Sequence, residues 1–296
     1  MEFKEFCDPV HGDIVLSAPL VAIVDTPQFQ RLRYVKQLGL TYFVYFGAVH
    51  SRFEHCIGTC HLAGRLIRSL KNNQPELNIT DKEILCIEIA ALCHDLGHGP
   101  FSHSFERFIE IAHGKRDWEH EEASIAMFDE IVSSKPTQQI LMSAGLEDDN
   151  FDLIKELIIG KPNPKRPLER RFLFEIVANK RNGIDVDKFD YFKRDCHHCG
   201  LKYAFDHERV FNNTKVLFAD GTSYICFRDK VVSCLADMYQ FRYSLHRDAV
   251  RSFIYILPVF FNVYTFSINT ALFVFSSICE FFILFFFKFN IALLLG

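Results

Sequence analysis

Two short segments of the chain concentrate residue types that bind metal ions. The first is His50-Ser51-Arg52-Phe53-Glu54-His55, and the second, residues 94–103, reads HDLGHGPFSH. Imidazole and carboxylate groups together form a ligand set for Zn, Fe, Mn or Mg. Gly97 and Gly99 allow the sharp backbone turn that an adjacent His-Asp pair needs to serve one ion. The two segments therefore predict a metal site.

The pattern of apolar residues predicts two helices that position these ligands. Thr80 and Glu83 form a capping box ahead of an apolar run, which predicts a largely buried helix that ends at His94 and Asp95. Residues 53–70 predict a second helix, and His55 begins its packed face. We therefore expect His55 to face the exit of the first helix.

Two more predicted helices carry candidate site residues. One spans residues 118–132 and has His120 in its first turn, and the other spans residues 184–196. On the latter, Asp187 is a candidate distant ligand because it can project from a packed helix into a cleft. The same pattern also fits a surface carboxylate on an amphipathic helix.

Few segments have the pattern of strands. Residues 13–16 predict a short strand, and Asp220-Gly221 between residues 215–219 and 222–227 is a strong hairpin signal. The remaining sequence favours helices with loops. It contains no internal repeat and no Gly/Ser linker. We predict a mainly α fold with a short β-hairpin.

Composition narrows the class of protein. The 296 residues are 49% hydrophobic, which is enough for a substantial core. A net charge of −4 shows no global basic field for nucleic acid. No signal-peptide pattern precedes the ten cysteines, so we expect reduced thiols. The run Cys196-His197-His198-Cys199 is weak evidence for zinc because no second ligand pair follows at a suitable spacing.

The composition changes near the C-terminus. Residues 252–279 hold no charged side chain and are long enough to cross a bilayer as a helix. This predicts a division into residues 1–250 and a Phe-rich hydrophobic tail, residues 251–296. The tail has three interpretations: a membrane anchor, an unrelated core segment, or the translated product of non-coding sequence.

Further motifs extend the two metal-binding segments. They are Asp8-Pro9-Val10-His11-Gly12, residues 25–33 (DTPQFQRLR) and residues 180–188 (KRNGIDVDK). With these motifs, residues 4–247 resemble the SAM and HD domain-containing deoxynucleoside triphosphate triphosphohydrolases. The resemblance implies an HD-domain helical fold and a metal-dependent reaction that converts a dNTP to deoxynucleoside and inorganic triphosphate. The N-terminal SAM module of that family is absent from this sequence.

The resemblance also implies roles for individual residues. It makes His55, His94, Asp95 and Asp187 the ligands of a divalent metal (Zn, Fe, Mn or Mg). It places His98, His103, Glu106 and His120 at the site of proton transfer, and we expect His103 to be the proton donor. The family often has Asp where this chain has Glu106. The implied substrate contacts are Gln37 and Leu38 near the sugar, Arg52, Lys188 and Tyr191 on the triphosphate, and Asp195 and His246.

Regulation and location are implied in the same way. A guanine nucleotide (GTP or dGTP) and a second dNTP would bind between subunits and assemble a tetramer. Asp25, Gln30 and Arg33 match the contacts of the guanine nucleotide, and Lys4, Arg209, Arg228 and Lys230 match positions near the neighbouring activator site. The family indicates a location in the nucleus and cytosol. By analogy, single-stranded nucleic acid is a further partner. If residues 252–279 act as a membrane anchor, they would instead place the chain on a membrane.

The resemblance stops near Asp248, and this leaves alternatives open. We expect an intact metal centre with impaired catalysis, because the C-terminal lobe of the family does not follow. One alternative is an inactive nucleotide-binding subunit that interferes with assembly. Another is an HD phosphodiesterase that acts on a different nucleotide. Sequence does not identify the metal, nor which of His98, His103 and His120 is the general acid.

Overall fold

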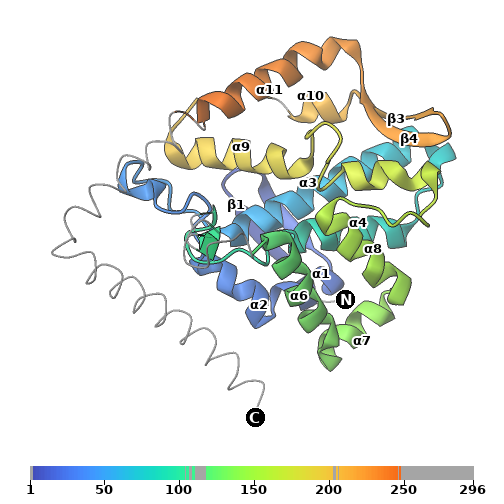
Figure 1. Cartoon of the computed structure of the whole chain (residues 1–296), viewed down its shortest axis with the longest axis horizontal. Coiled ribbons are helices and arrows are strands. Elements are labelled where there is room, and N and C mark those ends of the chain that lie inside the picture. Colours follow the sequence, from blue (N-terminus) through green and yellow to red (C-terminus); the bar gives the residue numbers. More distant parts are fainter. Residues whose placement is uncertain are drawn as a thin grey trace. The chain divides into compact units, whose positions relative to one another are not determined.

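Helices dominate the part of the chain that the structure describes (Figure 1). The computed structural model describes residues 3–103, 105–106, 109–110, 118–202, 205, 207–245 and 247. The α-helices are α1 (Ala18–Val24), α2 (Pro27–Gln30), α3 (Arg52–Asn73), α4 (Asp81–Cys93), α6 (His120–Ser133), α7 (Lys135–Ser143), α8 (Asp148–Ile159), α9 (Val186–Cys199), α10 (His207–Phe211) and α11 (Val232–Leu245). Short 3-10 helices are η1 (Arg31–Tyr34), η2 (Thr41–Phe43), η3 (Pro75–Leu77), η4 (Leu168–Glu175) and η5 (Asp229–Val231). The prediction of a mainly α fold is confirmed.

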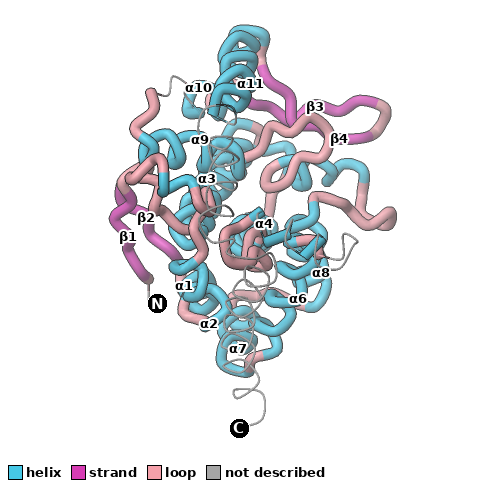
Figure 2. Tube along the Cα trace, turned by 60° about the vertical axis from the view of Figure 1, so that its left-hand side comes forward, coloured by secondary structure: helices cyan, strands magenta, loops and turns pink. Residues whose placement is uncertain are grey.

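Two antiparallel hairpins complete the described fold (Figure 2). Strand β3 (Thr214–Ala219) pairs with β4 (Thr222–Phe227), as the Asp220-Gly221 signal predicts. Both turn residues have positive φ, 51° and 75°, which suits a tight hairpin turn. Strand β2 (Gly12–Leu16) was also predicted, but its partner β1 (Lys4–Asp8) was not. The sequence of β1, KEFCD, has little apolar character, and its pairing with β2 stabilises it.

The core forms around α3, which contacts both α4 and α9, while α8 contacts the other side of α4. In both ribbon views, α9 lies between α11 and α3. Apolar side chains such as Ile57, Leu62 and Ile67 of α3 and Ile87 of α4 are buried. Removal of this apolar surface from water stabilises the packing of α3 on α4 and α9. These three helices supply the residues of the site.

Helix caps set where these elements begin and end. The Thr80 hydroxyl accepts a hydrogen bond from the Glu83 amide at 3.2 Å, and the Glu83 carboxylate accepts one from the Thr80 amide at 2.8 Å, so the predicted capping box of α4 is confirmed. Helix α9 begins at Val186, two residues after the predicted start, because the Asp185 carboxylate accepts from the Lys188 amide and caps the helix. Helix α4 ends at Cys93, so His94 and Asp95 stand at its exit as predicted.

Residues 1–245 form one compact unit. Within the described residues, no helix combines the length and the apolar character needed to cross a membrane. His246, the predicted boundary at residue 250 and the apolar segment 252–279 lie outside the described residues.

Candidate metal centre

Four side chains from three helices converge on one point. His55 comes from α3, His94 and Asp95 follow α4, and Asp187 comes from the first turn of α9. The Nε2 atom of His55 lies 3.3 Å from Nε2 of His94, 3.4 Å from Oδ2 of Asp95 and 3.1 Å from Oδ1 of Asp187. The Nε2 atom of His94 lies 3.5 Å from each of the same two carboxylate oxygens. The structure thus brings together all four residues that the resemblance implies as ligands.

The spacing of these atoms fits a divalent cation. Nitrogen and oxygen ligands lie about 2.0–2.2 Å from an ion such as Zn²⁺, so two neighbouring ligands at tetrahedral or octahedral angles are about 3.0–3.5 Å apart. The distances of 3.1–3.5 Å match this range. Three of the residues, His55, His94 and Asp95, form a buried cluster able to hold a metal, and Asp187 completes it from a side chain that is 29% exposed. The donor set of two imidazoles and two carboxylates suits Zn, Fe or Mn.

Each histidine of the set is oriented through its second ring nitrogen. The Nδ1 atom of His55 lies 2.7 Å from Oδ2 of Asp190, and Nδ1 of His94 lies 2.8 Å from the carbonyl oxygen of Ala91. Such contacts to a carboxylate or carbonyl fix the tautomer that leaves Nε2 available for a metal. Both histidines are therefore ready to present Nε2 to the same ion.

Asp190, which contacts His55, belongs to a network of buried charged residues. The second oxygen of Asp190 lies 2.7 Å from Nε2 of His11, and Arg194 donates to both Asp190 oxygens at 2.8 Å. Arg194 also donates to Asp8 at 2.7 Å. Sequence reasoning missed Asp190 and Arg194 as site residues, although the run from Asp8 to Gly12 already placed an acid and a histidine three residues apart. This network ties the β1–β2 turn to the metal centre.

Electrostatics favour a positive charge at the point of convergence. Burial acts to raise the pKa of Asp187, but contacts with His55 and His94 outweigh it and hold the pKa well below its usual range. Burial acts to lower the pKa of His55, but Asp187, Asp190 and Asp95 outweigh it and raise that pKa. The site thus keeps its carboxylates ionised and attracts a cation.

A second cluster, formed by His98, His103, Glu106 and His120, lies beside Asp95. The Nε2 atom of His98 lies 3.3 Å from Oδ1 of Asp95, and the His98 ring stacks on His120 with centroids 4.1 Å apart. Glu106 lies between two histidines, 2.6 Å from Nδ1 of His120 and 3.5 Å from Nδ1 of His103. The structure therefore groups all the residues that the resemblance places at proton transfer.

These histidines differ in their protonation. Burial and the nearby Arg52 guanidinium hold the pKa of His98 well below its usual range, so His98 is neutral. Burial also acts to lower the pKa of His120, but its hydrogen bond with Glu106 outweighs this and raises the pKa. The His103 side chain is 70% exposed. The cluster thus combines a neutral ring, His98, with a ring whose pKa is raised, His120.

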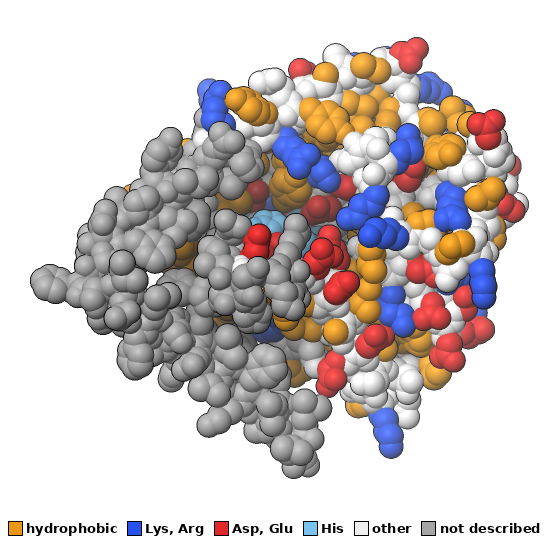
Figure 3. All heavy atoms as spheres, in the orientation of Figure 1, with side chains coloured by type: hydrophobic (Ala, Val, Ile, Leu, Met, Phe, Trp, Pro, Cys, Tyr) orange, Lys and Arg blue, Asp and Glu red, His pale blue; other side chains and the backbone are white. Residues whose placement is uncertain are grey.

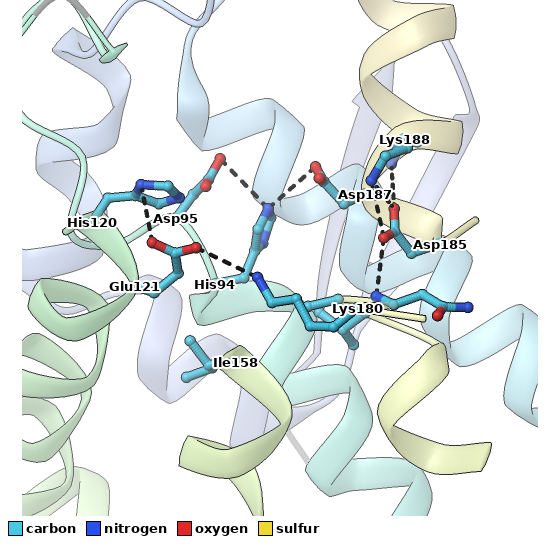
Figure 4. A pocket seen from close by; sticks show the side chains of 12 residues that line it. His94, Asp95, His120, Glu121, Ile158, Lys180, Asp185, Asp187 and Lys188 are labelled. Carbon is cyan, nitrogen blue, oxygen red and sulfur yellow. Dashed lines mark hydrogen bonds and ion pairs between the residues drawn. The ribbon is translucent and has the colours of Figure 1, made fainter. Parts of the chain in front are cut away.

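A cavity of about 150 Å³ opens at the metal centre. Figure 4 shows Asp95 and Asp187 reaching His94 from opposite sides, with Lys180 near Glu121 and Lys188 beside Asp185. Burial acts to lower the pKa of Lys188, but Asp185 and Asp187 outweigh it, so Lys188 remains a cation. On the surface, histidine and acidic side chains meet at one place with Lys and Arg side chains beside them (Figure 3). The cavity can thus accept an anion next to a metal.

Of the implied substrate residues, Lys188 lines this cavity, and the others have contacts of their own. Arg52 contacts the Asp95 carboxylate and donates to the Ser102 hydroxyl at 3.1 Å, while the Tyr191 ring lies 6.4 Å from the ring of His55. Ser102 in turn donates to the carbonyl oxygen of Lys36 at 2.7 Å, next to Gln37 and Leu38. Asp195 is buried on α9. His246 lies outside the described residues.

The implied activator residues form two groups on the surface. Lys4 and Asp25 are paired at 2.5 Å, and Arg33 donates to the Gln30 side chain at 2.9 Å and lies over the Phe53 ring. In the second group, Arg209 donates to the carbonyl oxygen of Lys230 at 3.3 Å, and Arg228 begins the turn that precedes η5. Each group brings together residues from separate elements.

The run from Cys196 to Cys199 ends α9 and supplies no ligand cluster. The two clusters of potential metal ligands found among the described residues, around His55 and around His98, do not include it. His198 instead stacks on His50 with centroids 4.4 Å apart.

Comparison with known proteins agrees with this geometry. The HD domain family model matches residues 52–194, which contain all four candidate metal ligands. The deoxynucleoside triphosphate triphosphohydrolase SAMHD1 of Gallus gallus is 54% identical over 258 residues, covering 83% of this chain and 42% of the relative. The Homo sapiens protein of the same name is 49% identical over 258 residues, covering 83% of this chain and 41% of the relative. The SAMHD1 homolog of Dictyostelium discoideum is 43% identical over 240 residues, covering 81% of this chain and 44% of the relative. The chain spans less than half the length of these relatives.

Residues 52–194, which hold the His-His-Asp-Asp centre, are similar to an HD domain. Within that class, the chain is homologous to the SAMHD1 deoxynucleoside triphosphate triphosphohydrolases over their HD region. The HD domain and the candidate ligands together indicate a divalent metal.

Proposed function

We propose that this chain hydrolyses deoxynucleoside triphosphates to deoxynucleoside and inorganic triphosphate. The observation that carries the proposal is the convergence of His55, His94, Asp95 and Asp187 within 3.1–3.5 Å, beside a cavity whose lining includes Lys180 and Lys188. Homology to proteins named for this activity supports the choice of substrate. In the reaction a water oxygen attacks the α-phosphorus, the bond from phosphorus to the 5′ oxygen breaks, and the 5′ oxygen takes up a proton.

The four ligands would hold one divalent cation, which when bound lowers the pKa of a water and neutralises phosphate charge. The residues of the chain itself supply orientation. Lys188 places positive charge at the cavity, and Arg52 places it beside Asp95, where its forked donors would suit phosphate oxygens. Ion pairs with Asp95 and Asp185 hold the Arg52 and Lys188 side chains in place before the substrate binds.

Proton transfer to the leaving 5′ oxygen is assigned to His103. Its ring is exposed to solvent, and Glu106 lies 3.5 Å from its Nδ1 atom and can stabilise the protonated ring. His120 is held at 2.6 Å by the same carboxylate and lines the cavity, where it can position water or phosphate. His98 is neutral and can accept a hydrogen bond beside Asp95.

Activation is a second part of the proposal. Asp25, Gln30 and Arg33 would bind a guanine nucleotide, and Lys4, Arg209, Arg228 and Lys230 would bind a dNTP at the neighbouring activator site of a tetramer. The contact between Gln30 and Arg33 and the contact between Arg209 and Lys230 support these assignments. The mass of the assembly in solution, measured with and without GTP plus dATP, tests this part separately from the reaction.

Product analysis tests the reaction. The full chain is incubated with dGTP and Mn²⁺, and products are separated by ion-exchange chromatography. Deoxyguanosine and triphosphate in equal amounts are expected, and their absence in Asp187→Ala would tie turnover to the metal centre. Nucleoside monophosphate with pyrophosphate would instead show an HD phosphodiesterase of another type. Binding of dGTP without any product would show a nucleotide-binding subunit that is catalytically inactive.

A further inference from the structure

The turn that follows α4 carries two residues of the site, the candidate metal ligand Asp95 and the neutral His98. Asp95, Leu96 and His98 are all buried. Backbone N–H and C=O groups that are removed from water need hydrogen-bond partners, because an unpaired polar group in the interior is unfavourable. The groups that contact this turn therefore decide how its backbone lies.

Helix α6 holds one side of the turn through Ser124, which is fully buried. The Ser124 hydroxyl accepts a hydrogen bond from the Gly97 amide at 2.8 Å and donates one to the carbonyl oxygen of His94 at 2.7 Å. The two segments also lie close together at Gly97, where a Cβ atom would overlap the carbonyl oxygen of His120. None of these contacts uses the carbonyl oxygens that follow, those of Leu96 and His98.

Arg31, the first residue of η1, donates to both of these carbonyl oxygens. Its Nη1 atom donates to the carbonyl oxygen of His98 at 2.9 Å, and its Nη2 atom donates to that of Leu96. The Nη2 atom also lies 3.2 Å from the sulfur of Met127 on α6. Arg31 thus joins η1 to a turn that lies 65 residues further along the chain.

The Arg31 guanidinium is a cation that uses backbone acceptors. Within the described part of the chain, its hydrogen-bond acceptors are two carbonyl oxygens and a sulfur, and its buried Nε atom has no hydrogen-bond partner. Burial lowers the pKa of Arg31 to about 10, so the group is still charged at neutral pH. Hydrogen bonds from a charged donor are roughly twice as strong as neutral ones. Arg31 therefore holds the turn firmly on the side that Ser124 does not reach.

The shape of the guanidinium suits this contact. The group is planar and its donors point in fixed directions, so one side chain can serve two carbonyl oxygens at the same time. Asp95 directly precedes Leu96, and its carboxylate lies 3.4 Å from Nε2 of His55 and 3.5 Å from Nε2 of His94. A rotation of the backbone at Leu96 would move this carboxylate away from the other ligands.

We propose that Arg31 is a positioning residue that holds Asp95 in place for the metal ion through the carbonyl oxygens of Leu96 and His98. Arg31 does not touch the metal or the substrate in this arrangement. The inference rests on the metal centre of the proposed function, and it is independent of which substrate binds there.

Metal affinity tests the inference directly. The full chain and its Arg31→Ala variant compete with a chelator for Zn²⁺ or Mn²⁺. We expect the affinity of the variant to fall about 10- to 100-fold, the usual effect of losing a group that supports metal ligands. Ethylguanidine matches the part of the side chain that is removed, and at millimolar concentration it should restore most of the affinity. Propylammonium and the variant Arg31→Lys offer a single amino group and should restore little.

Arg170 provides the matched control. Its guanidinium also donates to two backbone carbonyl oxygens, those of Leu77 and Asn78. These residues precede α4, whereas the metal centre lies at its other end, about 20 Å away along the helix axis. Arg170→Ala should lower the free energy of unfolding in urea but keep the wild-type metal affinity, with and without ethylguanidine.

The outcomes separate positioning from loss of structure. If Arg31→Ala does not fold, Arg31→Gln decides, because its amide lacks both the charge and the fork, and its metal affinity should also fall. Unchanged affinity in the folded variant overturns the inference, as does an equal loss in Arg170→Ala or a loss in Arg31→Ala that ethylguanidine does not reverse. A wild type that binds neither ion overturns the metal centre of the proposed function, and the role of Arg31 with it.

Discussion

The Nδ1 atom of His55 lies 2.7 Å from Oδ2 of Asp190, which is 135 residues further along the chain. Because Nδ1 is engaged in this way, Nε2 is the atom of His55 that faces His94 and Asp187. Asp190 in turn contacts His11 and Arg194. The orientation of one candidate metal ligand thus depends on a network that reaches the first hairpin.

Replacing Asp190 by Asn should weaken metal binding. The neutral amide stabilises the His55 ring less well, and changes at such supporting positions typically cost about 10- to 100-fold in metal affinity. Competition with a chelator, followed by elemental analysis, measures the affinity for Zn²⁺ or Mn²⁺. Asp8→Asn is the matched control, because it removes a partner of Arg194 without touching His55. Equal losses in the two variants would assign the effect to Arg194 rather than to His55.

A methyl group at Gly58 should disturb the same network. Gly58 lies on α3 three residues after His55, and a Cβ atom there would overlap the Asp190 carboxylate and the Arg194 guanidinium, both fully buried. We expect Gly58→Ala to lower the free energy of unfolding by about 1–3 kcal/mol and to reduce metal affinity. Urea unfolding measures the first effect. Gly64→Ala on the same helix meets the Glu88 and Arg68 side chains, and Arg68 is exposed and can move, so its cost should be smaller.

The assignment of His103 as proton donor predicts a selective rescue. His103→Ala should reduce the hydrolysis rate of dGTP about 100-fold or more, the usual contribution of a general acid. A substrate with sulfur in place of the 5′ oxygen has a leaving group that needs no proton, so the variant should cleave it at nearly the wild-type rate. His120→Ala, measured in parallel, should be slow on both substrates. Rescue of His120→Ala instead of His103→Ala would reverse the two assignments.

The contact between Glu106 and His120 predicts a change in protonation. Burial opposes a charged His120 ring, and the hydrogen bond with Glu106 at 2.6 Å outweighs this and raises its pKa. Glu106→Gln removes that charge, so the pKa of His120 should fall and the protonated fraction at pH 7 should decrease. NMR titration of the labelled imidazole measures this directly. Glu121→Gln, whose carboxylate is farther away at 3.4 Å, should produce a smaller decrease.

The low pKa values of His61 and His207 predict that the folded chain loses stability in acid. Burial lowers the pKa of His61 and of His207 to about 4, below the value of about 6.5 in an unfolded chain. Between these values the unfolded chain binds more protons, so stability is complete above pH 6.5 and decreases as the pH falls toward 4. Urea unfolding at several pH values should show a weaker decrease in His61→Gln than in the wild type.

Local signals in the sequence were sufficient for several elements. Thr80 and Glu83 begin α4 through contacts three residues apart, and Asp220-Gly221 forms a hairpin turn through its own backbone preferences. The start of α9 was placed two residues early because Asp185 fits the helical pattern yet acts as its cap. Strand β1 was missed because its pairing with β2, and not its own composition, makes it a strand.

The sequence by itself determined which residues could bind a metal and that His94 and Asp95 stand together at the end of a buried helix. These properties follow from residue type and from contacts within a few positions of the chain. Only the tertiary structure decided that Asp187 lies 3.1 Å from His55, that Asp190 orients that histidine, and that His50 turns away to Asp195. Periodicity shows which face of a helix is buried but not which helix covers it. The packing of α3 against α4 and α9 makes that choice, and with it the composition of the site.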